Sequence, residues 1–180
     1  MIKVDKWTKE QGIKFFKKVG IKKGDIIFDC CCGEGNYTIP AAKISGKNGM
    51  VYAMDMNKNK LDTLKEKSNL ENLVNINIIE KEFKKSIPLP DKSVDMVLLY
   101  DIFWYFSIED IRLPVLLDEV YRILKNNGLL SIYPEHVDAN KLKLIIINAN
   151  FRLEQEFFNS LIHNNNLKKG YIWNFRIALK

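Results

Sequence analysis

Residues 26 to 36 set the expected topology of the chain, and they read Ile26-Ile27-Phe28-Asp29-Cys30-Cys31-Cys32-Gly33-Glu34-Gly35-Asn36. An apolar, β-prone run ends in an acidic residue, a short loop of small residues follows, and a helix is expected to begin near Asn36. This order is typical of a nucleotide-binding βαβ unit, in which the loop backbone comes close to a ligand. Gly33 and Gly35 remove side-chain bulk from the loop and permit a positive φ.

A second apolar run, residues 50–54, ends at Asp55, which lies 20 residues beyond Gly35. In doubly wound folds an acidic residue at about this distance accepts hydrogen bonds from ribose hydroxyls, and it would repel the 2′-phosphate of NADP. The two strand ends therefore predict an adenosine site. The simpler alternative is a tight turn in an α/β protein that binds nothing.

Helices and strands are expected to alternate along the chain. The patterns predict helices up to Gly20, from Asn36, after Asn57, from Ser107 and after Asp138, and strands over residues 26–30, 50–54, 74–79, 94–100 and 129–133. Two closing strands, 152–159 and 171–179, are expected to be joined by the polar stretch 164–170. Since we see no repeat and no linker, we expect one domain over residues 1–180, with residues 1–20 as an N-terminal helix and candidate lid.

Several blocks of the chain together resemble one family, the class I S-adenosylmethionine-dependent methyltransferases, and within it the small UbiE-like (methyltransferase type 11) branch. The family pattern Asp-x-Gly-x-Gly-x-Gly is matched by residues 29–35, and the likeness continues through residues 51–55, 87–97 and 119–128. The resemblance implies an α/β, doubly wound, Rossmann-like fold. Its seven-stranded, mostly parallel sheet would have an antiparallel last strand and helices on both faces.

The resemblance also implies S-adenosyl-L-methionine as the cofactor. Asp29 would order the first loop and meet the ammonium group, Tyr100 would lie beside the methionine part, and Met56 would lie under the adenine. Cys31 stands where the family has glycine, so a positive φ there would be costly for its side chain. The candidate cofactor-binding residues are Asp29, Cys31, Gly33, Gly35, Asp55, Met56, Glu82, Phe83 and Tyr100, with Glu82 and Phe83 at the adenine edge.

The methyl acceptor is expected to bind beside residues 100–106, where five of seven residues are aromatic. Trp104 stands where many relatives have histidine, so a histidine base is not carried over. Asp101, Glu135 and His136 are candidates near the expected site, whereas His163 in the closing hairpin is expected to be remote. No catalytic residue and no metal ligand is assigned. A small-molecule acceptor is expected, and neither its identity nor the oligomeric state is predicted.

The net charge is +6 with a sequence pI near 9.1, and the lysines are scattered on expected helix faces. Solvated helix faces explain this pattern better than nucleic-acid binding does, so an RNA methyltransferase is the alternative and a nicotinamide-dependent oxidoreductase a more distant one. The three cysteines are adjacent, which excludes a disulfide framework and favours a reducing, cytoplasmic compartment. They would point to different sides of a strand, which argues against metal ligation, whereas arsenite methylation by a few cysteines stays an open alternative. No segment has the length of a membrane span.

Overall fold

The computed structural model describes residues 6–164 and 166–178, and within them a seven-stranded sheet has the order β3-β2-β1-β4-β5-β7-β6. The strands are β1 (Ile26–Cys30), β2 (Met50–Asp55), β3 (Ile76–Glu80), β4 (Val94–Tyr100), β5 (Leu124–Tyr133), β6 (Phe151–His163) and β7 (Asn166–Ile177). The first five pair in parallel, and β7 runs antiparallel to both β5 and β6. The predicted fold class, with an antiparallel last strand, is confirmed.

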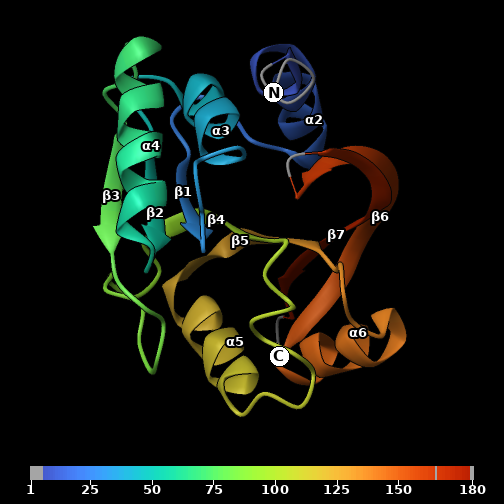
Figure 1. Cartoon of the computed structure of the whole chain (residues 1–180). Helices are drawn as coiled ribbons and strands as arrows, with labels where there is room; N and C mark the ends of the chain where they lie inside the picture. The colour runs from blue at the N-terminus through green and yellow to red at the C-terminus, as the bar shows by residue number, and fades with distance from the viewer. Residues whose placement is uncertain (1–5, 165, 179–180) are drawn as a thin grey trace.

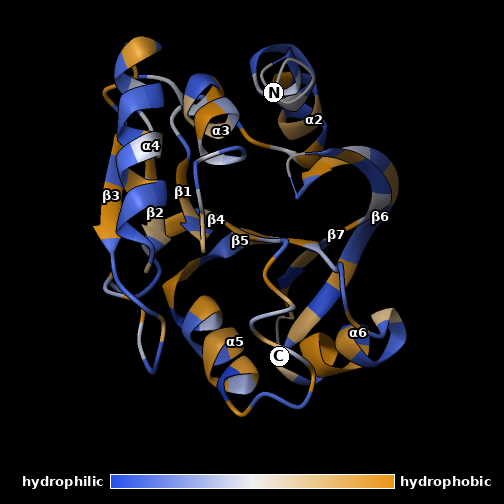
Figure 2. Ribbon diagram, in the orientation of Figure 1, coloured by the Kyte–Doolittle hydropathy of each residue, from blue (hydrophilic) through white to orange (hydrophobic). Residues whose placement is uncertain are grey.

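Helices cover both faces of the sheet, as Figure 1 shows. One side carries η1 (Trp7–Gln11), α2 (Gly12–Val19), α3 (Thr38–Ser45) and α4 (Lys58–Leu70), and the other carries α5 (Arg112–Ile123) and α6 (Ala139–Asn148). The alternation of β1 explains the two layers, because Ile27 packs with the aromatic residues of α2 and Phe28 packs in the cluster that includes α5 and α6. In Figure 2 the ribbon of α4 is mainly hydrophilic, whereas the central strands are mainly hydrophobic.

The carboxyl ends of the parallel strands meet at one edge of the sheet. The strand order reverses between β1 and β4, and in open α/β sheets such a switch point leaves a crevice outside the strand ends. Asp29, Asp55 and Tyr100, each at or near the end of its strand, are therefore placed toward the same edge. This edge is where the predicted site falls.

The closing hairpin differs from the prediction. Its strands are longer than expected, and the polar residues 166–170, predicted as a connection, belong to β7. β6 tolerates many polar residues because it lies at the edge of the sheet and pairs only with β7. Likewise β5 begins at Leu124 instead of Leu129, and α5 begins at Arg112 instead of Ser107.

The far end of the hairpin bends back over the sheet toward α2 (Figure 1). Two hydrogen bonds anchor it there: the indole N–H of Trp7 donates to the carbonyl of Ser160 over 2.9 Å, and the hydroxyl of Tyr37 donates to the carbonyl of Ile162 over 2.6 Å. Trp7 is buried against Phe15 and Tyr37, so it packs within the fold. The lid function predicted for residues 1–20 stays a prediction, and residues 1–5 lie outside the described part.

Among the described residues, no helix has the length and hydropathy of a membrane span.

Candidate functional site

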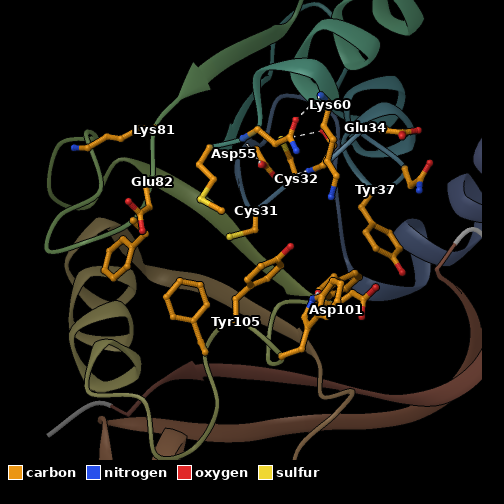
Figure 3. A pocket seen from close by; sticks show the side chains of 18 of the residues that line it. Cys31, Cys32, Glu34, Tyr37, Asp55, Lys60, Lys81, Glu82, Asp101 and Tyr105 are labelled. Atoms are coloured by element: carbon orange, nitrogen blue, oxygen red, sulfur yellow. Dashed lines mark hydrogen bonds between the residues drawn. The ribbon is translucent and has the colours of Figure 1, made fainter.

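A pocket of about 290 Å³ opens at the carboxyl ends of β1, β2 and β4. Its wall comes from six segments: the first loop between Cys31 and Tyr37, the end of β2 with the start of α4, residues 81–83, the aromatic loop 100–106, Arg112 at the start of α5, and the hairpin tip at Ile162 and Asn164. Figure 3 shows Cys31, Cys32 and Asp55 on one side of this space and Asp101 and Tyr105 on another. The pocket therefore joins the two halves of the predicted site.

The first loop adopts the left-handed conformation at three positions, with φ of 57° at Cys31, 55° at Gly33 and 80° at Gly35. Gly33 lines the pocket, whereas Gly35 is not among its lining residues. A Cβ on Gly35 would stand 2.2 Å from Cδ1 of Leu64 in α4, so packing against this helix excludes a side chain there. Cys31 accepts the positive φ that the family pattern gives to glycine, and such a conformation is strained for a residue with a Cβ.

Asp55 ties the end of β2 to the glycine loop. One carboxylate oxygen accepts a hydrogen bond from the backbone N–H of Gly33 over 2.9 Å, and the other accepts from the N–H of Asn57 over 2.8 Å. Asn57 in turn caps α4 by accepting from the N–H of Lys60, and the helix starts after Asn57 as predicted. The carboxylate lines the pocket, and its predicted contact with a ribose stays a prediction.

Asp29 is buried behind the loop instead of lying in the pocket wall. The hydroxyl of Thr38, at the start of α3, donates to its carboxylate over 2.6 Å. Burial is the main cause that raises the pKa of Asp29 to about 7, and the hydrogen bond from Thr38 opposes that shift. The structure thus ties Asp29 to the start of α3, and its predicted roles in ordering the loop and in meeting an ammonium group stay predictions.

The adenine-side candidates all line the pocket. Met56 is 57% exposed and offers an apolar surface beside Asp55. Phe83 is buried against Phe106, with ring centroids 6.0 Å apart, and Glu82 lies at the rim, 3.9 Å from the guanidinium of Arg112. Their roles in binding stay predictions.

Tyr100 lines the pocket while its side chain is largely buried. Its hydroxyl shares a 2.7 Å hydrogen bond with that of Ser131, and its ring stacks on Phe16 of α2. Burial is the largest cause that raises the pKa of this phenol far above its usual value, so it stays protonated. Tyr100 therefore offers a neutral wall next to the first loop.

The end of the pocket formed by residues 100–106 lies close to a histidine that the sequence placed elsewhere. The prediction that His163 is remote is wrong, because its Nδ1 lies 2.8 Å from Oδ1 of Asp101. The bent hairpin carries His163 over the sheet to the end of β4, a displacement that no local sequence pattern encodes. His136 also approaches this carboxylate, with Nε2 3.9 Å from the same oxygen, and its ring stacks on Trp104. Glu135, the remaining candidate, is paired with Lys168.

Several pocket residues were not predicted. Tyr37 follows the glycine loop by two residues, so its place in an expected first helical turn could have indicated it. Arg112 and Asn164 reach the pocket from a helix and a hairpin that are distant in sequence. Only the packing of those elements brings them there, and no short motif marks them.

The cysteine run does not supply reactive thiolates at its buried positions. The hydrogen bond with Cys31, followed by burial, raises the pKa of Cys30 well above its usual value, and burial raises the pKa of Cys32 similarly. Since the thiolate is the form that binds metals, these shifts argue against ligation by the two buried thiols. Cys31 is half-buried and lines the pocket.

Comparisons with known proteins bear on this arrangement. A family model described as a methyltransferase domain matches residues 27–128. Demethylmenaquinone methyltransferase of Lactobacillus johnsonii is 32% identical over 144 residues, which are 80% of this chain and 57% of that protein. The enzyme of the same name from Listeria welshimeri is 28% identical over 172 residues, or 93% of this chain and 66% of that protein. This chain thus spans about half to two thirds of the length of such relatives.

Among solved structures, a SAM-dependent methyltransferase from Aquifex aeolicus superimposes with a TM-score of 0.74 at 22% identity, covering 98% of this chain and 97% of that one. At this identity the likeness is evidence for the fold alone.

Proposed function

The chain belongs to the family of methyltransferase domains, and on that premise we propose that it transfers a methyl group from S-adenosylmethionine to a small-molecule acceptor. The observation that carries the proposal is the hydrogen bond between Asp55 and the backbone of Gly33, because it places a carboxylate and a bulk-free loop together at the pocket. The resemblance stated from sequence is confirmed, and this family membership argues against the nicotinamide-dependent oxidoreductase. The net charge of +6 is the feature that favours the RNA alternative.

The cofactor end suits a nucleoside. The two observed hydrogen bonds use one lone-pair position on each oxygen of Asp55, and an ionised carboxylate has about four such positions. The remaining positions are available for two adjacent ribose hydroxyls. Met56 would then lie against the adenine ring, with Phe83 at its edge. The left-handed backbone at Cys31 and Gly33 would pass beside the methionine part.

The acceptor end suits a planar, partly apolar molecule. Trp104, Tyr105 and Phe106 contribute to the wall from one loop, and the rings of Trp104 and Tyr105 lie 4.8 Å apart. Aromatic walls bind flat apolar groups through large contact areas and stacking. The similarity to demethylmenaquinone methyltransferases makes an aromatic ring with hydroxyl groups a sensible first acceptor to test.

Methyl transfer from S-adenosylmethionine requires mainly that the protein position the two reactants. The sulfonium of the cofactor is an activated leaving group, so the enzyme has to hold an acceptor lone pair in line with the sulfur–methyl bond and to exclude water. The pocket joins both ends in one space, where the two reactants would lie side by side. We also propose that residues 1–180 act as a single domain in the cytoplasm, with residues 1–20 helping to close the pocket.

Calorimetric titration with S-adenosylhomocysteine tests the cofactor site. We expect the wild-type chain to bind it and Asp55→Ala to bind more weakly by about 1–3 kcal/mol, because hydrogen-bond partners of the ribose are lost. Asp62→Ala, in the exposed part of α4, is the matched control and should bind like the wild type. Absence of binding, or equal binding by Asp55→Ala, would contradict the proposal.

Methyl transfer is measured with radiolabelled S-adenosylmethionine and 1,4-dihydroxynaphthalene. Total RNA serves as a second acceptor. Label in the naphthalene product supports a small-molecule acceptor, whereas label in RNA alone would overturn it.

A further inference from the structure

Three titratable side chains from separate elements converge at the acceptor end of the pocket. Asp101 follows β4, His136 follows β5, and His163 ends β6. Both imidazoles approach the same carboxylate oxygen of Asp101, at 2.8 Å for His163 and 3.9 Å for His136. Asp101 lines the pocket, and Figure 3 places it away from Asp55, across the space where an acceptor would bind.

The hydrogen bonds of His163 define its role. The side-chain amide of Asn164 lies 3.0 Å from Nε2 of His163, and an amide N–H can only donate, so Nε2 accepts. The proton of the neutral imidazole is then on Nδ1, which donates to Asp101. His163 is thus occupied at both ring nitrogens and holds the carboxylate in place. Both imidazole contacts fall on Oδ1 and neither uses Oδ2, and Asp101 lines the pocket.

We propose that Asp101 accepts the proton of an acidic hydroxyl group on the methyl acceptor, and that His163 is the residue that positions it. This inference rests on the proposed methyltransferase function and adds the acid–base group and the acceptor class to it. A carboxylate selects an acceptor with a phenolic or enolic O–H, because such a group donates a charge-assisted hydrogen bond before it gives up its proton.

The surroundings of Asp101 strengthen it as a base. Its side chain is 19% exposed, and burial is the largest cause that raises its pKa above the usual value, against the opposing effects of His163 and His136. Glu135, beyond β5, raises the pKa further by its negative charge, and the buried phenol of Tyr37 faces Asp101 from the first loop. A carboxyl group with a raised pKa holds an accepted proton better than an ordinary one.

The proposed step balances as follows. The acceptor O–H bond breaks and its proton passes to Asp101. The electron pair, at the oxygen or at the conjugated ring carbon, forms the bond to the methyl carbon. The methyl–sulfur bond breaks, and its electrons stay on sulfur as neutral S-adenosylhomocysteine. If the ring carbon attacks, the methylated product first forms as a keto tautomer. It becomes aromatic again when the proton on the methylated carbon moves to the oxygen.

The test uses the full chain saturated with S-adenosylhomocysteine, and it compares the binding of 1,4-dihydroxynaphthalene with that of 1,4-dimethoxynaphthalene, which has no O–H. We expect at least about a tenfold preference for the dihydroxy compound, lost in Asp101→Asn, since a carboxylate acceptor is stronger than a neutral one. Asp118→Asn, on the exposed face of α5, is the control and should keep the preference. All variants should keep their affinity for S-adenosylhomocysteine, which shows that they fold.

A pH series tests the positioning residue. The preference should disappear as the pH falls through the pKa of Asp101, because the protonated carboxyl no longer accepts. In His163→Ala the midpoint should move to higher pH, since the hydrogen bond that lowers the pKa is gone. His163→Asn, which keeps an N–H near the Nδ1 position, should restore the wild-type midpoint.

Three outcomes would overturn the inference: equal binding of the two naphthalenes, binding of neither, or a preference retained in Asp101→Asn. If S-adenosylhomocysteine still binds in these cases, the proposed function stands. Failure to bind S-adenosylhomocysteine would instead overturn the proposed function.

Discussion

The two ends of the pocket are built in different ways. The cofactor end is assembled from the first loop and the end of the next strand, with Asp55 bonded to Gly33, 22 residues away. The acceptor end is assembled from Asp101 and His163, 62 residues apart, through a hairpin that bends over the sheet. Residues closer in sequence carry the proposed cofactor end, and long-range packing carries the part that would choose an acceptor.

This difference has a physical basis. A positive φ, a helix cap and a strand-end carboxylate depend on neighbours a few residues away, so they tolerate changes elsewhere in the chain. The Asp101–His163 contact depends on the anchors of the hairpin at Trp7 and Tyr37. Perturbations of the first loop should therefore change cofactor binding and stability without moving the acceptor end.

The largest expected effect concerns the buried carboxyl of Asp29. Its pKa is raised to about 7 in the folded chain, so the folded state holds this proton more tightly than the unfolded state does. The protonated carboxyl therefore contributes stability at low pH, and this contribution is lost as the pH rises through the folded-state pKa of about 7. Asp29→Asn stays neutral throughout. Relative to the wild type its unfolding free energy should rise by on the order of 3 kcal/mol between about pH 5 and about pH 8, since each pKa unit is worth about 1.4 kcal/mol.

Urea denaturation at the two pH values measures this difference. A parallel pH dependence in the variant and the wild type would show that Asp29 is not the group that titrates.

A smaller effect should separate the two glycines of the loop. Gly35→Ala places a Cβ 2.2 Å from Leu64, at a φ of 80°, and should lower the free energy of unfolding by about 2–3 kcal/mol through overpacking and strain. Gly33→Ala has the same backbone requirement, but its Cβ would meet Lys60 only at 4.0 Å, so it should cost about 1 kcal/mol.

Thermal denaturation ranks these two variants, and the NMR signal of His163 reports whether the acceptor end is disturbed. Equal losses at the two positions would mean that contact with Leu64 does not decide the need for Gly35. A shifted His163 signal would mean that the two ends of the pocket are coupled.

The smallest effect is expected at Cys31. Glycine relieves the strain of the left-handed backbone but gives the unfolded chain more freedom, so the two effects partly cancel. Cys31→Gly should therefore raise the free energy of unfolding by no more than about 1 kcal/mol. Its affinity for S-adenosylhomocysteine, measured by calorimetry, should be kept or improved. A large loss of affinity would show that the thiol has a task of its own at the pocket.

Much of the cofactor end could be predicted from the residues alone. The strand at 26–30, the start of a helix after Asn57 and the pocket positions of Gly33, Asp55 and Met56 follow from short patterns whose physics is local. The amino-acid order also predicted the parallel sheet, because buried parallel strands are continuous apolar runs separated by helices.

Tertiary structure alone decided the rest. It turned Asp29 away from the pocket wall, made Gly35 a packing requirement of α4, and brought His163 and Asn164 to Asp101. These contacts join residues far apart in the chain, and their geometry depends on how far β6 and β7 extend and where the hairpin bends. No pattern of a few neighbouring residues contains that information, because it is set by the packing of whole elements against one another.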